Sequence, residues 1–202
     1  MYDSKHMKTE HAAFIALKKT IDSYAPLSTK TWNALTDFCE FKAIEKQSVL
    51  YASSEVPASF AFVYSGLFRC FVHDSNGNEY NKIFFDAGSF PGAMTALLTA
   101  SPSQLTIESL EPSLIISINF KAYRELLYAT NDLMLFHILY LEKNWLLAKD
   151  AREIEIVQQN ASQRYQQFLQ DHPSLSARIP QYHIASHLGI TPTQLSRIRK
   201  KT

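Results

Sequence analysis

The last 22 residues, 181–202, constrain the fold most, because their pattern predicts two short helices joined by a sharp turn. Gly189 can end the first helix, since a left-handed backbone conformation costs little without a Cβ atom. Thr191 is a good N-cap for the second helix, and Pro192 fits its first position, where a missing N–H does no harm. The small Ala185 leaves room for the second helix to cross the first.

The apolar residues of this segment recur at helical spacing and predict that the two helices pack against each other. Ile184 and Leu188 share one face of the first helix, and Leu195 and Ile198 share one face of the second. The outward positions of the second helix are polar or basic: Thr193, Gln194, Arg197, Arg199 and Lys200. Such a helix fits the major groove of DNA, so the segment is interpreted as a helix-turn-helix. The alternative is an ordinary helical hairpin with a solvated basic end.

The charge distribution also favours DNA as the partner. Residues 161–202 hold six Lys or Arg against one acid, a net charge of +5, whereas the whole chain carries +1, so residues 1–160 carry −4. A basic end on an otherwise acidic chain is typical of proteins that bind nucleic acid. Neutralisation of phosphates by this cluster predicts binding that weakens strongly with salt.

The bulk composition narrows the class of protein. A chain of 202 residues makes one large domain or two small ones. No segment approaches the ~20 apolar residues of a membrane span, and the N-terminus lacks the pattern of a signal peptide. Cys39 and Cys70 fit free, buried thiols in a reducing compartment, with a disulfide as the alternative. We therefore expect a cytoplasmic protein without a membrane segment.

Residues 39–120 have the pattern of a β domain. Aromatic and β-branched residues come in short runs separated by Ser, Gly, Pro and Asn, and Asn76-Gly77 is a strong hairpin signal. Seven strands are predicted: 41–44, 49–52, 60–64, 67–73, 79–85, 105–109 and 114–119. Strands of this number and spacing favour a sandwich, barrel or jelly roll. Apolar residues at helical spacing in residues 10–24, and again after Ser28, predict two helices before the β domain.

Residues 131–158 predict one helix of about 42 Å. From Leu133 to Leu141 only His137 is polar, so this half is expected to be covered on nearly every side. One apolar seam at 3–4 spacing predicts the interface of a homodimer: Ile138, Leu141, Trp145 and Ala148. A single long core helix is the alternative. A dimer also explains the basic end, because two-fold proteins place two recognition helices about one DNA turn apart.

These elements predict an α+β fold with three parts: a β-roll with flanking helices at 1–130, a dimerisation helix at 131–158 and a DNA-binding domain at 159–202. Their order resembles that of the CRP/FNR superfamily of bacterial transcription regulators. Residues 64–69, 88–92 and 119–127 are similar to the superfamily's β-roll motifs and the following short helix. Residues 179–192 are similar to a branch associated with Bacteroidetes. The resemblance implies a jelly roll like the cyclic nucleotide-binding domain, a homodimer, an inverted-repeat operator and RNA polymerase as a partner.

The chain departs from the members that bind cyclic AMP. The Glu that takes the ribose hydroxyl in those members falls on Ala93, and their phosphate-binding Arg falls on or beside Ser103-Gln104. No Lys or Arg occurs between Lys82 and Lys121. Burying an unpaired phosphate is expensive, so no useful affinity for cyclic AMP or cyclic GMP is expected, and no cofactor is assigned.

The effector pocket predicted for the β-roll comprises these residues: Phe85, Phe90, Ala93, Met94 and Gln104. It is largely apolar, and the sequence leaves open whether it holds a small apolar effector or is filled core.

The resemblance also implies roles on the DNA. Arg197 matches a base-reading Arg of the superfamily and is expected to contact guanine. Thr193 and Gln194 are expected to add base or phosphate contacts, and Thr191 and Lys200 to anchor phosphates. Because Pro192 and Thr193 replace the Arg and Glu of the cyclic-AMP receptor, a different operator is expected.

Other classes of function have less support. A cupin-like enzyme needs at least two His on neighbouring strands, and only His73 falls on a predicted strand. No nucleophile lies in a recognisable turn, so no catalytic and no metal residues are predicted. His183 and His187 could bind a metal at i, i+4 spacing, but a solvated helix face is the favoured interpretation. Haem remains open, and so does a ligand-binding or protein-interaction module of the same fold without DNA regulation.

Overall fold

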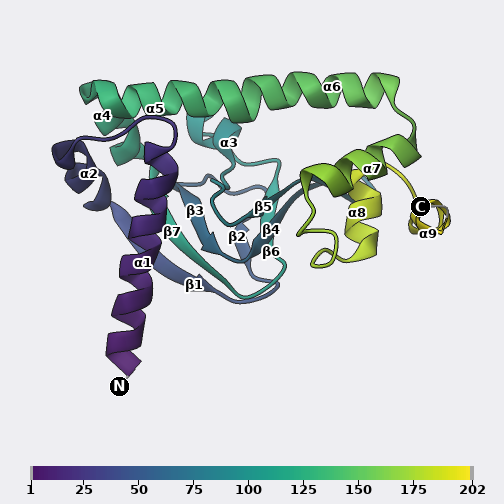
Figure 1. Ribbon diagram of the computed structural model, residues 1–202, viewed down its shortest axis with the longest axis horizontal. Helices are drawn as coiled ribbons and strands as arrows, with labels where there is room; N and C mark the ends of the chain where they lie inside the picture. Colours follow the sequence, from purple (N-terminus) through teal and green to yellow (C-terminus); the bar gives the residue numbers. More distant parts are fainter. Residues whose placement is uncertain (1, 201–202) are drawn as a thin grey trace. The chain divides into compact units, whose positions relative to one another are not determined.

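The computed structural model describes residues 2–200 and forms two compact units (Figure 1). The first unit contains the chain up to Cys70 and Phe84–Glu142, and the second contains Phe71–Ile83 and the chain from Lys143 on. The division differs from the predicted parts in two ways: the tip of a β-hairpin groups with the C-terminal helices, and the long helix is divided near Glu142. Lys201, counted in the basic cluster, lies outside the described residues.

All seven predicted strands are present, with ends that differ by at most two residues. They are β1 (Cys39–Ile44), β2 (Val49–Tyr51), β3 (Ser59–Ser65), β4 (Leu67–His73), β5 (Glu79–Asp86), β6 (Thr106–Ser109) and β7 (Ser113–Asn119). The helices are α1 (Tyr2–Asp22), α2 (Thr29–Thr36), α3 (Met94–Thr99), α4 (Phe120–Ala129), α5 (Asn131–Leu141), α6 (Ala148–Gln158), α7 (Ala161–Asp171), α8 (Gln181–His187) and α9 (Pro192–Arg199), with a π-helical turn at Glu142–Leu147.

The strands form two sheets, in the orders β1-β7-β3 and β2-β6-β4-β5. One apolar cluster lies between them: Ala61, Val63 and Ile115 come from the first sheet, and Phe68, Cys70 and Ile107 from the second. On the first sheet, α1 and α4 contact β3 and β7 and close a second, larger cluster. The first unit is therefore a β-roll with helices packed on one of its sheets.

A tight connection between β3 and β4 depends on Gly66. Its φ of +114° is a conformation that side-chain-bearing residues rarely adopt, and a Cβ atom there would lie 2.7 Å from Cα of Ser113. We expect Gly66→Ala to lower the free energy of unfolding by about 3 kcal/mol, from backbone strain and overpacking together. Gly77→Ala is the control, since φ is +82° but nothing lies within 4 Å of its Cβ position. Urea unfolding checks both, and equal losses would contradict the role of Ser113.

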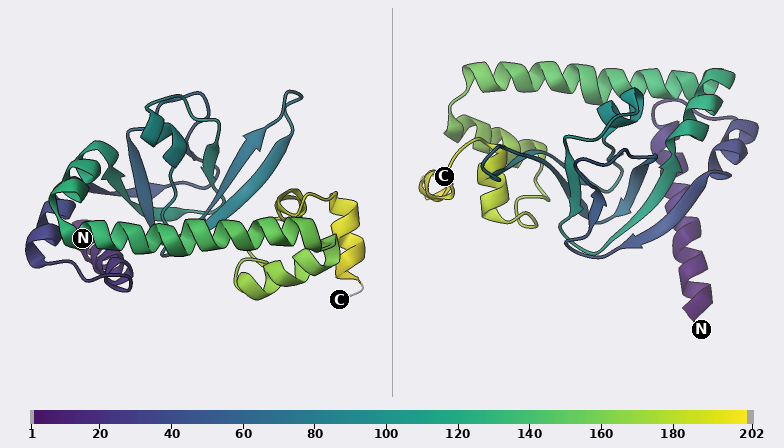
Figure 2. Two further views of the ribbon diagram at one scale, coloured as in Figure 1. Left: turned by 90° about the horizontal axis from the view of Figure 1, so that it is seen from above. Right: turned by 180° about the vertical axis from the view of Figure 1, so that it is seen from behind.

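The backbone stays helical from α5 through the π-helical turn into α6 (Figure 2). The expectation that residues 133–141 are covered on nearly every side is wrong for the single chain. Leu133 and Phe136 are buried, whereas Leu135 and Ile138 are 50% and 45% exposed. One side of α5 packs on the larger core cluster, and nothing in the described chain covers the opposite side.

Two smaller expectations concern membranes and cysteines. Among residues 2–200, we find no helix with both the length and the apolar character that a membrane span requires. Cys39 and Cys70 are free thiols; Cys70 is buried and Cys39 partly so. Burial raises the pKa of Cys39 to about 12, so this thiol stays protonated at neutral pH.

Candidate nucleic-acid interface

The turn between α8 and α9 is closed by backbone hydrogen bonds. The N–H of Ile190 donates to the carbonyl of Ala185 at 3.0 Å, and the N–H of Gly189 donates to that of Ser186 at 3.1 Å. This pair of bonds is a Schellman motif, in which the residue after the C-cap is left-handed; Gly189 has φ +69°. The predicted helix end at Gly189 is thus confirmed.

The start of α9 is capped as the sequence predicts. Thr191 is the N-cap, Pro192 follows at the first position, and the Thr191 hydroxyl accepts from the N–H of Gln194 at 3.1 Å. In return, Oε1 of Gln194 accepts from the N–H of Thr191 at 2.9 Å, which completes a capping box. Gln194 therefore has a structural role that was not predicted from the sequence.

The structure places the predicted DNA-contacting residues together on and beside α9. Leu195 is buried against the rest of the unit, and Ile198 is half-buried. The predicted set is exposed: Thr191, Thr193, Gln194, Arg197, Arg199 and Lys200. The outer face of α9 is therefore polar and basic, and its three cations are open to a ligand.

The helix before the turn, α8, packs on the tip of the β4–β5 hairpin within the same unit. Nδ2 of Asn81 lies 3.1 Å from Nδ1 of His183, and the N–H of Asn81 donates to the Ser186 hydroxyl at 3.0 Å. That hydroxyl donates to the carbonyl of Glu79 at 3.0 Å. His183 is only 5% exposed, so the interpretation of His183 and His187 as a solvated face is wrong. For His183 the reason is a partner about one hundred residues earlier in the chain, whereas His187 lies against Arg152 and Phe168.

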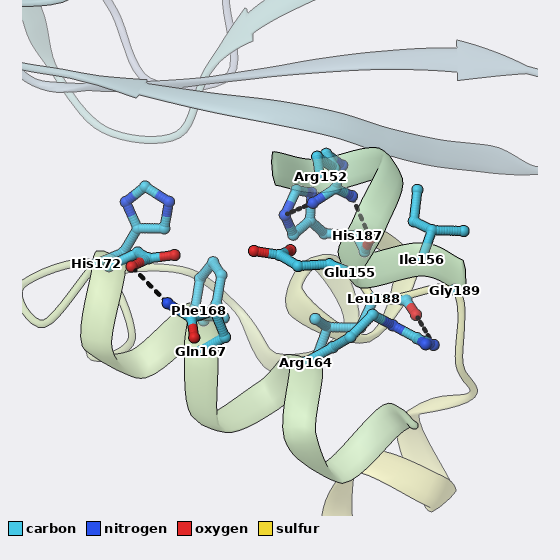
Figure 3. A pocket seen from close by; sticks show the side chains of 11 residues that line it. Arg152, Glu155, Ile156, Arg164, Gln167, Phe168, His172, His187, Leu188 and Gly189 are labelled. Atoms are coloured by element: carbon cyan, nitrogen blue, oxygen red, sulfur yellow. Dashed lines mark hydrogen bonds between the residues drawn. The ribbon is translucent and has the colours of Figure 1, made fainter. Parts of the chain in front are cut away.

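Two arginines from other helices donate to the carbonyls at the end of α8. Nη2 of Arg152 on α6 donates to the His187 carbonyl at 3.2 Å, and its Nη1 lies 3.3 Å from Nε2 of the His187 ring. Arg164 on α7 donates to the Leu188 carbonyl at 3.1 Å and to the Gln159 carbonyl at 2.6 Å. Both side chains line a cleft of about 330 Å³ (Figure 3).

The environment of His187 makes it a weak base. Burial, together with the positive charge of Arg152, lowers the pKa of His187 from its ordinary 6.5 to about 4. Between these values the unfolded chain binds a proton that the folded chain excludes, so this group's contribution to stability is lost as the pH falls from 6.5 to 4. We expect His187→Gln to lose less stability between pH 7 and pH 5 than the wild type. Urea unfolding at the two pH values measures this difference, and an equal loss would contradict it.

The predicted dimer residues are accessible along the long helical stretch. Ile138 and Trp145 are 45% and 47% exposed, Ala148 is exposed and Leu141 is half-buried. Further apolar side chains on the π-helical turn and α6 are more than half exposed: Leu146, Leu147, Ile154, Ile156 and Val157. Apolar residues at this density on one exposed stretch need a partner surface.

The predicted pocket residues of the β-roll do not form one group. Phe90 is in ring contact with Phe62 and Tyr140, with centroids 5.2 Å apart in both pairs, and Met94 packs in the same cluster. Phe85 instead packs against the cluster between the sheets, Ala93 is buried and Gln104 is exposed. The aromatic part of the predicted pocket is thus occupied by neighbouring rings.

The buried charge of the β-roll is already paired. Nη2 of Arg69 lies 2.8 Å from Oε2 of Glu108, and the two side chains are 6% and 17% exposed. Arg69 ends the superfamily-like motif at 64–69 and lies on β4. Its charge is therefore compensated within the sheet.

Comparison with known proteins identifies this β-roll. Residues 41–129 match the family model of the cyclic nucleotide-binding domain, while no curated protein sequence matches the chain. The fold is similar to that of CLP from Xanthomonas campestris, a c-di-GMP-responsive global regulator (TM-score 0.68, 14% identity, 86% of this chain and 91% of that one). The fold is also similar to that of FixK2 from Bradyrhizobium japonicum (TM-score 0.66, 16% identity, 81% of this chain and 83% of that one).

A third similar structure is a single sensor domain. The sensor domain of the transcriptional regulator DNR from Pseudomonas aeruginosa has a TM-score of 0.54 and 16% identity, over 63% of this chain and 92% of that one. At these identities the likeness establishes the fold. Residues 41–129 thus form a β-roll of the cyclic nucleotide-binding type, and the chain around it has the fold of these bacterial regulators.

Proposed function

We propose that this chain is a sequence-specific DNA-binding transcription regulator that acts as a homodimer. One observation carries the proposal: α8 and α9 are two short helices joined by a capped turn, and apart from Pro192 the exposed residues of α9 are polar or basic. A capped helix of this size fits the major groove, and its cations meet the phosphates on either side.

Within this proposal, α9 is the recognition helix. Arg197 reads guanine through its N7 and O6 atoms, and Thr193 contacts a neighbouring base or phosphate. Thr191, Arg199 and Lys200 contact phosphates, whose negative charge draws the basic end to DNA. Gln194 contributes through its amide nitrogen, since its Oε1 atom is held in the capping box.

The dimer forms through the exposed apolar stretch of α5 and α6. It places two copies of α9 on an inverted repeat, as two-fold proteins do. The resemblance to the CRP/FNR superfamily supports a cytoplasmic location and RNA polymerase as a further partner. A small apolar effector, if the β-roll senses one, enters by displacing the rings around Phe90.

The β-roll is proposed to have no useful affinity for cyclic AMP or cyclic GMP. Arg69 is neutralised by Glu108, and residues 83–120 contain no Lys or Arg to receive the phosphate. A phosphate buried without a cation loses its hydration and gains no compensating bond. Isothermal calorimetry with either nucleotide is expected to give no binding heat up to millimolar concentration, and micromolar binding would refute this.

The function is tested by incubating the purified protein with fragmented genomic DNA at moderate salt and sequencing what it retains. An enriched inverted repeat with half-sites about one helical turn apart is the expected result. Retention without a shared motif would mean that α9 does not read sequence. No retention would favour the alternative, a ligand-binding or protein-interaction module of the same fold.

A further inference from the structure

The end of α8 has an unusual set of hydrogen-bond partners. The last carbonyls of a helix lack partners within it and need caps. Those of Ile184, Ala185 and Ser186 accept from backbone N–H groups of the turn. Those of His187 and Leu188 accept instead from guanidinium groups that belong to α6 and α7.

These two arginines, Arg152 and Arg164, form what we term the arginine clamp. Positive charge at a helix C-terminus is favourable, so the clamp also stabilises the α8 dipole. A guanidinium presents several donors in a rigid fork, which a lysine does not. Each arginine uses two of them, and burial lowers the pKa of Arg152 from its ordinary value.

The clamp spans the break between α6 and α7. Gln159, the C-cap of α6, has an extended backbone with φ −103° and ψ 140°, so the helix stops there. Arg164 bonds the carbonyl of Gln159 with one nitrogen and that of Leu188 with the other. A single side chain thus joins the break in the long helix to the turn before α9.

The clamp is not part of the exposed basic face. Arg152 and Arg164 are half-buried, whereas Arg197 is exposed. The cleft that they line also contains two carboxylates, Glu155 and Asp171, which disfavour a phosphate (Figure 3). The clamp therefore connects helices within the unit and is not a binding site for phosphate.

We infer that Arg152 and Arg164 are positioning residues that hold α8 and α9 at a fixed angle to α6, and thereby make the dimer selective for the distance between half-sites. This inference rests on the proposed function. One inserted base pair moves a half-site by about 3.4 Å and rotates it by about 35° about the DNA axis. If α8 and α9 are held rigidly to α6, the dimer binds poorly to a site with changed spacing. If they are released from α6, they can adjust to the new spacing.

The first test needs no DNA. Amide hydrogen exchange is followed at Gly189 and Ile190, whose N–H groups close the turn. Arg152→Ala and Arg164→Lys are each expected to speed exchange there by about tenfold or more, because a charge-assisted bond is lost. Lys149→Gln is the matched control: it removes one charge from α6, but its side chain is 69% exposed and forms an ion pair with Glu153 on the same helix. Unchanged exchange in both clamp variants would overturn the inference.

The second test uses the operator that the wild type selects, with its half-site spacing changed by one base pair. Wild type and Lys149→Gln should lose about tenfold in affinity or more, and the clamp variants only about threefold or less. Their salt dependence should equal that of the wild type. A salt slope reduced by about 1 per lost arginine would make these residues phosphate contacts and overturn the inference.

The outcomes separate the two proposals. Circular dichroism and sedimentation check that each variant is folded and has the wild-type oligomeric state; Arg164→Lys keeps the charge and remains available if Arg152→Ala fails to fold. If exchange is faster in the clamp variants but the wild type selects no operator, the proposed function alone is refuted. Full spacing selectivity in both clamp variants, with an operator in hand, refutes the inference alone.

Discussion

Ile138→Glu is expected to convert the proposed dimer into monomers. Ile138 is 45% exposed on α5 and lies on the predicted seam. Fully burying such a side chain contributes about 1.5–3 kcal/mol, and 45% of the Ile138 surface remains to be buried, so a two-fold interface loses about 1.4–2.7 kcal/mol. The dimer dissociation constant should rise about 10-fold to 100-fold from this loss, and further because two carboxylates would be buried together. Sedimentation velocity over a range of protein concentrations measures the change.

The matched control for this substitution is Ile15→Glu. Ile15 is also an apolar helical residue, on α1, and is 55% exposed. It lies away from the predicted seam, so its replacement should leave the sedimentation coefficient unchanged. If Ile138→Glu stayed dimeric at the concentrations of the wild type, the interface would lie elsewhere, and the spacing of the two α9 helices would need another origin.

Local patterns predicted most of the fold, since strands and caps are short-range features. Alternating and β-branched runs placed all seven strands, and Thr191-Pro192 placed the start of α9. Two elements were missed. The helix α3 is short, and its N-cap, Ala93, makes no side-chain cap bond. The π-helical turn at Glu142–Leu147 has no local sequence signal.

The site was predicted less completely, because part of it depends on contacts between distant residues. The exposed face of α9 follows from helical periodicity alone. His183 looked solvated because its partner, Asn81, lies 102 residues away. The arginine clamp is invisible for the same reason: Arg152 lies 35 residues from His187 and Arg164 lies 24 residues from Leu188. The capping box between Thr191 and Gln194 could have been predicted from the sequence, since Thr at the N-cap and Gln at the N3 position are the residue types that it requires.

Arg197→Ala is expected to remove sequence preference at one position of each half-site. A bidentate contact to guanine contributes about 1–3 kcal/mol of discrimination, so an operator with two half-sites should lose about 2–6 kcal/mol of binding free energy. The loss should vanish on operators in which that guanine is already replaced. Competition binding against all four bases at this position measures it.

Lys200→Ala separates base reading from general charge loss. Lys200 is exposed at the end of α9 and is proposed to contact a phosphate. Its removal should weaken binding to every sequence alike and reduce the salt slope by about 1 for each lost phosphate contact, with the preferred base unchanged. Arg197→Ala should instead flatten the preference at one position, and selectivity for half-site spacing should survive, because the clamp is intact. An Arg197→Ala variant that keeps the wild-type preference at every position would show that another side chain reads the guanine, and Thr193, one helical turn earlier on the same exposed face, would be the next to replace.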